Sequence, residues 1–62
     1  MTWAFLLILL LPTGQEQRLE FKGYRSLAVC DAVMRREVQQ AMKLMRPYRL
    51  QGLSTTRCEE QS

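Results

Sequence analysis

Apolar residues form two blocks along this 62-residue chain, an uninterrupted run near the start and a periodic stripe in the middle. The run extends from Trp3 to Leu11 and is followed by Pro12, Thr13 and Gly14, after which the sequence becomes polar. As a helix, a run of this length covers only about half of the ~30 Å hydrocarbon layer of a bilayer, so it does not predict a transmembrane anchor. A short apolar segment with small residues at its exit is typical of a secretory signal peptide.

We therefore predict that residues 1–14 are a signal peptide, that cleavage follows Gly14, and that the mature chain starts at Gln15 and is secreted to the extracellular space. The apolar run departs from the usual pattern because no Lys or Arg precedes it. Two alternatives stay open. One is an uncleaved leader that retains the chain in the endoplasmic reticulum membrane, and the other is a buried helix or strand of a cytosolic protein. We disfavour the buried element because so small a remainder offers little cover for consecutive apolar side chains.

The middle of the chain predicts one amphipathic helix over residues 27–46. Its apolar residues are three or four positions apart and, at about 100° per residue, they form one continuous stripe. Ser26 provides a capping hydroxyl at the start, and Pro47 ends the helix because proline lacks an amide proton and disfavours a helical residue before it. We expect the stripe to be a partner-binding face, with the members Leu27, Met34, Val38, Ala41, Met42 and Met45.

The segments beside this helix carry weaker signals. Leu19 and Phe21 alternate with charged residues, which favours a brief extended segment over residues 18–22. Residues 47–62 have the composition of turns and loops, so we expect an irregular tail. The predicted fold class is therefore mainly α, with a signal peptide followed by one amphipathic helix and irregular flanks. Residues 15–62 are small and near the lower limit of independent folding, so a folded and an only partly folded chain both stay open.

Two cysteines, Cys30 and Cys58, follow the predicted leader. An even count favours pairing in an oxidising compartment. The distance along the helix from Arg46 back to Cys30 is about 24 Å, and the residues from Arg46 to Cys58 can span about 36 Å, so a bond within one chain is within reach. A bond between two chains, which would give a disulfide-linked dimer, and two free thiols are the alternatives.

The residue types that common catalytic and metal sites need are missing or isolated. The chain contains no histidine, which removes the usual general base at neutral pH and the usual zinc ligand. It has no glycine-rich phosphate loop, and two distant cysteines cannot complete a four-ligand metal site. We therefore predict that the protein is not an enzyme and that it uses no cofactor and no metal.

The charge of the chain does not identify a partner by itself. Nine basic and six acidic residues give a net charge of +3, and the chain has no Lys/Arg-rich run with interleaved aromatic residues, which argues against nucleic-acid binding. The leading hypothesis is a non-catalytic secreted polypeptide that binds a protein partner through the helix over residues 27–46. The alternatives are a truncated or short-reading-frame product of a larger secreted protein with no independent activity, and a cationic peptide that lies on a membrane surface.

Overall fold

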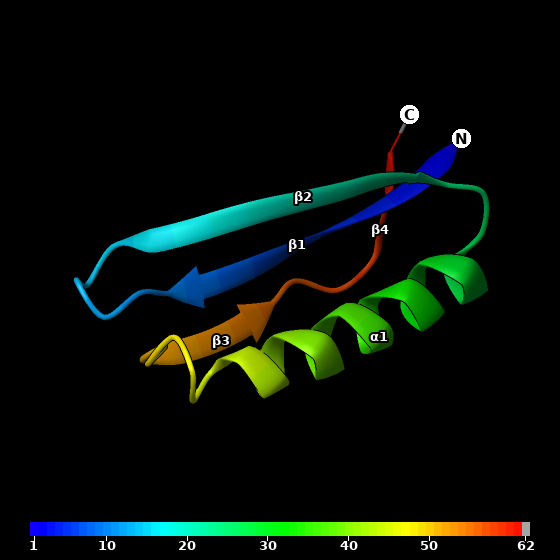
Figure 1. The fold of residues 1–62 in the computed structure, drawn as a ribbon. Coiled ribbons are helices and arrows are strands. Elements are labelled where there is room, and N and C mark those ends of the chain that lie inside the picture. The colour runs from blue at the N-terminus through cyan, green and yellow to red at the C-terminus, as the bar shows by residue number, and fades with distance from the viewer. Residues whose placement is uncertain (62) are drawn as a thin grey trace.

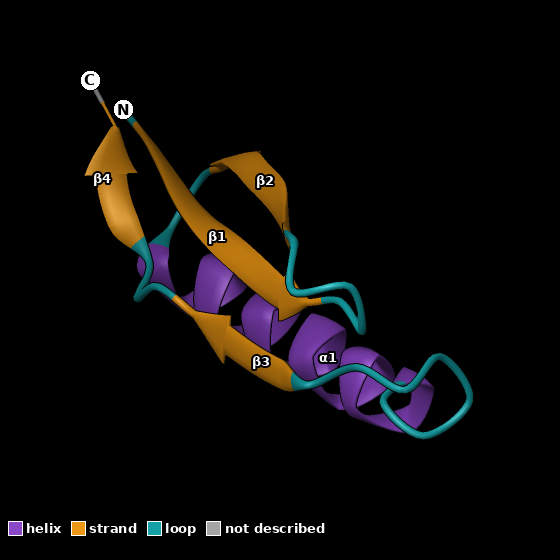
Figure 2. Ribbon diagram, turned by 90° about the vertical axis from the view of Figure 1, so that its left-hand side faces the viewer, coloured by secondary structure: helices purple, strands orange, loops and turns teal. Residues whose placement is uncertain are grey.

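The N-terminal apolar run forms the central strand of an antiparallel sheet in the computed structural model, which describes residues 1–61 (Figure 1). The segment Glu16–Tyr24 (β2) pairs with one edge of this strand, and the segments Gly52–Thr55 (β3) and Glu59–Gln61 (β4) pair with its other edge. The single helix packs against one face of the sheet (Figure 2), which gives a small two-layer α/β fold. The elements in chain order are β1 (Thr2–Leu10), β2 (Glu16–Tyr24), α1 (Leu27–Leu44), β3 (Gly52–Thr55) and β4 (Glu59–Gln61).

This architecture shows that the mainly α fold class predicted from the sequence is wrong. The run of consecutive apolar side chains favours a leader over a buried strand only if one packing element has to shield all of those side chains from water. In a strand, successive side chains point to opposite faces of the sheet, so the helix needs to cover only every second one. Phe5 and Leu7 are each 2% exposed on the face that carries the helix, whereas Leu6 and Ile8 point to the other face and are half-buried.

A tight turn joins β1 to β2 at the position where leader cleavage is predicted. The Leu11 amide donates to the Gln15 carbonyl at 2.8 Å, and the Gly14 amide donates to the Leu11 carbonyl at 2.9 Å. Gly14 has a φ of 89°, which glycine adopts without the steric cost of a β-carbon. These are the features of a three-residue hairpin loop whose last residue is left-handed. The residues that resemble the exit of a signal peptide therefore act as a hairpin turn in this fold.

The helix α1 begins at Leu27, as the sequence predicts, and ends at Leu44 rather than at residue 46. The Ser26 hydroxyl accepts a hydrogen bond from the Val29 amide at 3.2 Å, which satisfies one of the free donors of the first turn. Beyond Leu44 the chain continues through turns to Arg49, whose φ of 54° reverses its direction toward β3.

The segment after the helix is ordered, which corrects the irregular tail predicted over residues 47–62. β3 pairs with the second half of β1 through partners such as Leu9 and Leu53, and β4 pairs with its first residues. Both strands are short and lie next to a distant part of the sequence, so their local composition gives little sign of them. The extended segment predicted over residues 18–22 is confirmed, and it belongs to the longer strand β2.

The core gathers around Phe5, between the sheet and the first half of α1. The Phe5 ring stacks on Phe21 with ring centroids 4.8 Å apart, and its centroid lies 6.2 Å from that of Tyr24. Cys30 and Cys58 form a disulfide that packs against Phe5, with their Cα atoms 6.2 Å apart. The predicted bond within one chain is thus confirmed, and it ties the helix to the segment that precedes β4.

Candidate functional site

The helix face predicted to bind a partner is divided between the sheet and the solvent. Most of the stripe faces the sheet because the sheet supplies the cover that an isolated helix would lack. Only part of it is available to another molecule. Ala41 is buried and Met34 packs against the core, Val38 and Met45 are half-buried, and Leu27 and Met42 are exposed.

An apolar groove of about 290 Å³ lies between the second half of α1 and β3. The helix lines it with three members of the predicted face, and the strand lines the other side. Its most accessible apolar side chain is Met42, which is 59% exposed. The methionines suit varied ligands because the unbranched thioether side chain adapts its shape. The lining residues are Val38, Met42, Met45, Leu53, Ser54 and Thr55.

β3 leaves one backbone edge unpaired beside this groove. The Thr56 amide donates to the Leu6 carbonyl at 3.0 Å, which fixes the phase of the hydrogen bonds between β1 and β3. In a strand, the backbone N–H and C=O groups of successive residues point to opposite edges. Since those of Thr56 point toward β1, the N–H and C=O groups of Leu53 and Thr55 point away from it. No other strand of the described residues pairs with this side of β3. The groove therefore combines an apolar lining with free backbone donors and acceptors.

The chain that leads out of this groove is cationic. Lys43, Arg46 and Arg49 are exposed at the end of α1 and in the turns after it. No Asp or Glu occurs between Glu37 and Glu59. This positive region favours a ligand that carries acidic groups next to its apolar ones.

The helical periodicity of the sequence indicates the helix side of this groove but not its strand side. Leu53 is an isolated apolar residue in a segment of turn composition, and nothing near it indicates a strand edge. Its role depends on pairing with β1, more than forty positions earlier, which local periodicity cannot show.

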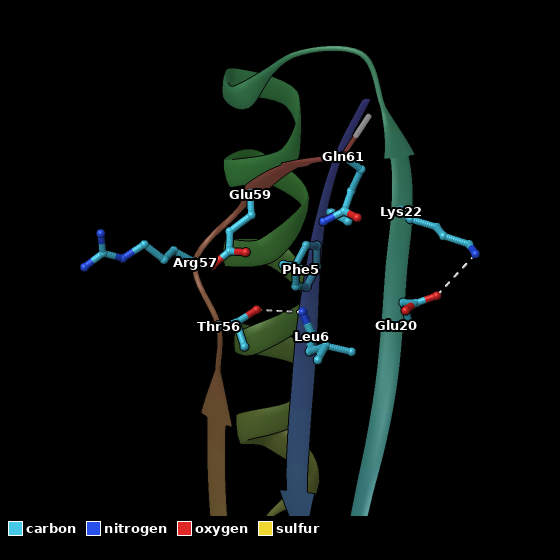
Figure 3. Close-up of a pocket in the computed structure, with 9 residues that line it drawn as sticks. Phe5, Leu6, Glu20, Lys22, Thr56, Arg57, Glu59 and Gln61 are labelled. Atoms are coloured by element: carbon cyan, nitrogen blue, oxygen red, sulfur yellow. Dashed lines mark hydrogen bonds and ion pairs between the residues drawn. The ribbon is translucent and has the colours of Figure 1, made fainter. Parts of the chain in front are cut away.

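A second hollow of about 260 Å³ lies on the face of the sheet opposite the helix (Figure 3). Its floor includes Leu6, whose amide donates to the Thr56 hydroxyl at 2.9 Å. The described residues contain no group of three or more potential metal ligands, here or elsewhere. The residues that line the hollow carry both positive and negative charges and include no cysteine or histidine, so the hollow is a polar surface depression. Its charged rim consists of Glu20, Lys22, Arg57 and Glu59.

The remaining predicted residues lie apart from both hollows. Gly14 and Gln15 are exposed in the hairpin between β1 and β2. Cys30 and Cys58 are buried and bonded to each other, and the described part of the chain has no free cysteine. A disulfide offers neither a thiolate nucleophile nor a thiolate metal ligand.

Comparison with protein-family models, with curated proteins and with solved structures gives no match for this chain. No helix in residues 1–61 has the length and apolar character needed to cross a membrane. The fold and the groove therefore define only a class: a small, disulfide-bonded α/β protein with an apolar groove beside a free strand edge.

Proposed function

We propose that the chain is a non-catalytic binding protein that holds an extended segment of a partner protein in the groove between α1 and β3. The observation that carries this proposal is the position of the free backbone groups of Leu53 and Thr55 beside the apolar lining of the groove. An extended peptide satisfies both features, because its backbone pairs with the strand edge and every second side chain enters the groove.

A helical partner fits these features less well than an extended one. A helix uses its backbone donors and acceptors internally, so it would cover the edge of β3 without pairing with it. The positive charges of Lys43, Arg46 and Arg49 further favour a segment with acidic residues at one end. The partner is thus an extended peptide with apolar residues at alternate positions and an acidic flank.

We also propose that the protein acts in the extracellular space or in another oxidising compartment. What supports this is the disulfide between Cys30 and Cys58, since such bonds persist in oxidising compartments and are rare in the cytosol. The absence of histidine and of free cysteine in the described chain is compatible with a role in binding.

The test uses a fluorescein-labelled short peptide with leucine at alternate positions and glutamates at one end, titrated with the full chain and followed by fluorescence anisotropy. Met42→Asp places a charge in the groove at a position exposed enough for the fold to persist. We expect it to weaken binding at least ~10-fold, which is about 1.4 kcal/mol. Thr55→Pro removes an outward amide and keeps the backbone hydrogen bonds to β1, but it also removes the bond from the Thr55 hydroxyl to the Leu6 carbonyl. Thr55→Val, which loses only the hydroxyl, is its control, and we expect the proline variant to bind the peptide more weakly than the valine variant.

Leu44→Asp is the matched control for Met42→Asp. Leu44 is 46% exposed, belongs to the same helix, and does not line the groove. Since both variants change the net charge equally, general repulsion of the acidic peptide affects both, and only the contact in the groove distinguishes them. Equal affinity of the two variants for the peptide would refute the proposed site.

A further inference from the structure

The strand β2 forms the edge of the sheet that lies farthest from the groove, and its outer side is unpaired (Figure 1). Within residues 1–61 it pairs only with β1. It has nine residues, compared with four in β3. An unpaired strand of this length is a template for addition of another strand. Because β2 takes no part in the groove, an inference about this edge is independent of the proposed function.

Charges of alternating sign occupy every second position of β2. They lie on the face of the sheet opposite α1, and all four side chains are more than half exposed. Arg18 approaches Glu16 at 3.4 Å, and Lys22 approaches Glu20 at 3.3 Å. The series begins with a negative charge and ends with a positive one, so an antiparallel copy of the strand presents the opposite charge at every position.

The central charged residues of β2 also direct their backbone N–H and C=O groups to the unpaired edge of the strand. The hydrogen bond from the Leu11 amide to the Gln15 carbonyl closes the hairpin. Since backbone groups of successive residues point to opposite edges of a strand, every second residue after Gln15 directs its N–H and C=O groups toward β1, as Gln17 and Leu19 do. Arg18 and Glu20 therefore direct their N–H and C=O groups to the open edge. The two central charged residues of the strand are thus also residues whose backbone groups are free to pair, while Lys22 lies at the register shift that precedes Tyr24.

We propose that this edge binds the same edge of a second copy of the chain, antiparallel, about a two-fold axis at Leu19. Each Arg18 then faces Glu20 of the second copy, and each Glu16 faces Lys22. The two half-buried Leu19 side chains meet at the axis on the helix side of the joined sheet. Such an interface uses the same patch on both copies and is closed by its symmetry.

The charges also select one register of this pairing. If the second copy slips by two residues, Arg18 faces Arg18, and Glu16 faces Glu20, which are repulsive pairs. Charges on edge strands often serve to prevent strand addition by repulsion. In β2 the alternating signs repel a slipped copy but attract a copy in the two-fold register. A single strand edge buries little surface, so the dimer forms reversibly and its population depends on concentration.

The test is sedimentation velocity of the full chain over a range of concentrations at low ionic strength. We expect the average mass to rise from monomer to dimer with concentration, and to fall back when salt screens the paired charges. R18E and E20R each create two repulsive pairs in the dimer, and we expect each to raise the dissociation constant at least ~10-fold. An equimolar mixture of the two variants should recover association, because both central pairs regain opposite charges.

The double variant R18E/E20R exchanges the two charges and should associate with itself but not with the wild-type chain. R35E is the matched control for R18E, since Arg35 is an exposed cation on α1 far from β2 along the chain, and it should dimerise as the wild type does. Far-UV circular dichroism establishes that each variant is folded. A wild-type chain that stays monomeric at all concentrations, or single variants that dimerise like the wild type, would overturn the proposal.

Discussion

Removal of the disulfide is the perturbation whose effect on folding is best defined by the structure. Cys30 is completely buried and Cys58 is 7% exposed, and both belong to the core around Phe5. Their bond closes a loop with a sequence separation of 28. On the chain-entropy model, a loop of this length restricts the unfolded chain enough to stabilise the fold by about 3.5 kcal/mol.

This contribution is large in relation to the whole fold. Proteins have a free energy of unfolding of roughly 0.05–0.15 kcal/mol per residue, which corresponds to about 3–9 kcal/mol for this chain. Loss of about 3.5 kcal/mol would lower the melting temperature of such a small domain by about 25 °C. We therefore expect the variant C30A/C58A to be marginally stable or unfolded at 25 °C.

The assay is urea denaturation followed by far-UV circular dichroism for the oxidised wild type, the reduced wild type and C30A/C58A. The reduced wild type keeps both sulfur atoms in the core, so its difference from the oxidised form isolates loop closure. The double variant adds the loss of packing around Phe5. If the reduced and oxidised wild types differ by less than ~1 kcal/mol, the assignment of a major stabilising role to loop closure is refuted.

Two further predictions concern the ends of the helix and of the chain. Ser26→Ala removes the acceptor for the Val29 amide and should lower the free energy of unfolding by about 1 kcal/mol. The measurement is urea denaturation, with Ser54→Ala as the exposed control. An effect no larger than that of the control would contradict the capping role. The intact mass of the protein from expressing cells should include residues 1–14 if the folded form with β1 accumulates. A product that starts at Gln15 would support the predicted signal peptide and would lack that strand.

The sequence predicts the helix better than the sheet because a helix is specified locally. The stripe spacing, the Ser26 hydroxyl and Pro47 all act within a few residues, and α1 accordingly begins at Leu27. The disulfide follows from cysteine count and chain reach. In contrast, β3 and β4 depend on pairing with a strand more than forty positions away, so their own composition carries little information.

The candidate site shows the same division. Val38, Met42 and Met45 follow from helical periodicity and line the groove. Met34 and Ala41 pack inward instead, and Leu27 is exposed outside the groove. Sequence cannot separate these roles, since the face of a helix that binds a partner and the face that packs on its own domain obey the same periodicity. The free edge of β3 is a property of the sheet order, which no local pattern in the sequence indicates.

Residues 1–14 cannot be both a cleaved leader and the strand at the centre of the sheet in the same molecule. A leader of residues 1–14 requires that the remainder fold without β1, yet β2, β3 and β4 all pair with this strand and not with one another. Removing it would expose the ring of Phe21, which stacks on Phe5, and would leave three separate strands around one helix. Isolated strands of this length are not stable in water. The groove and the paired edge proposed above therefore belong to the molecule that retains β1, and a chain cut after Gly14 would have neither.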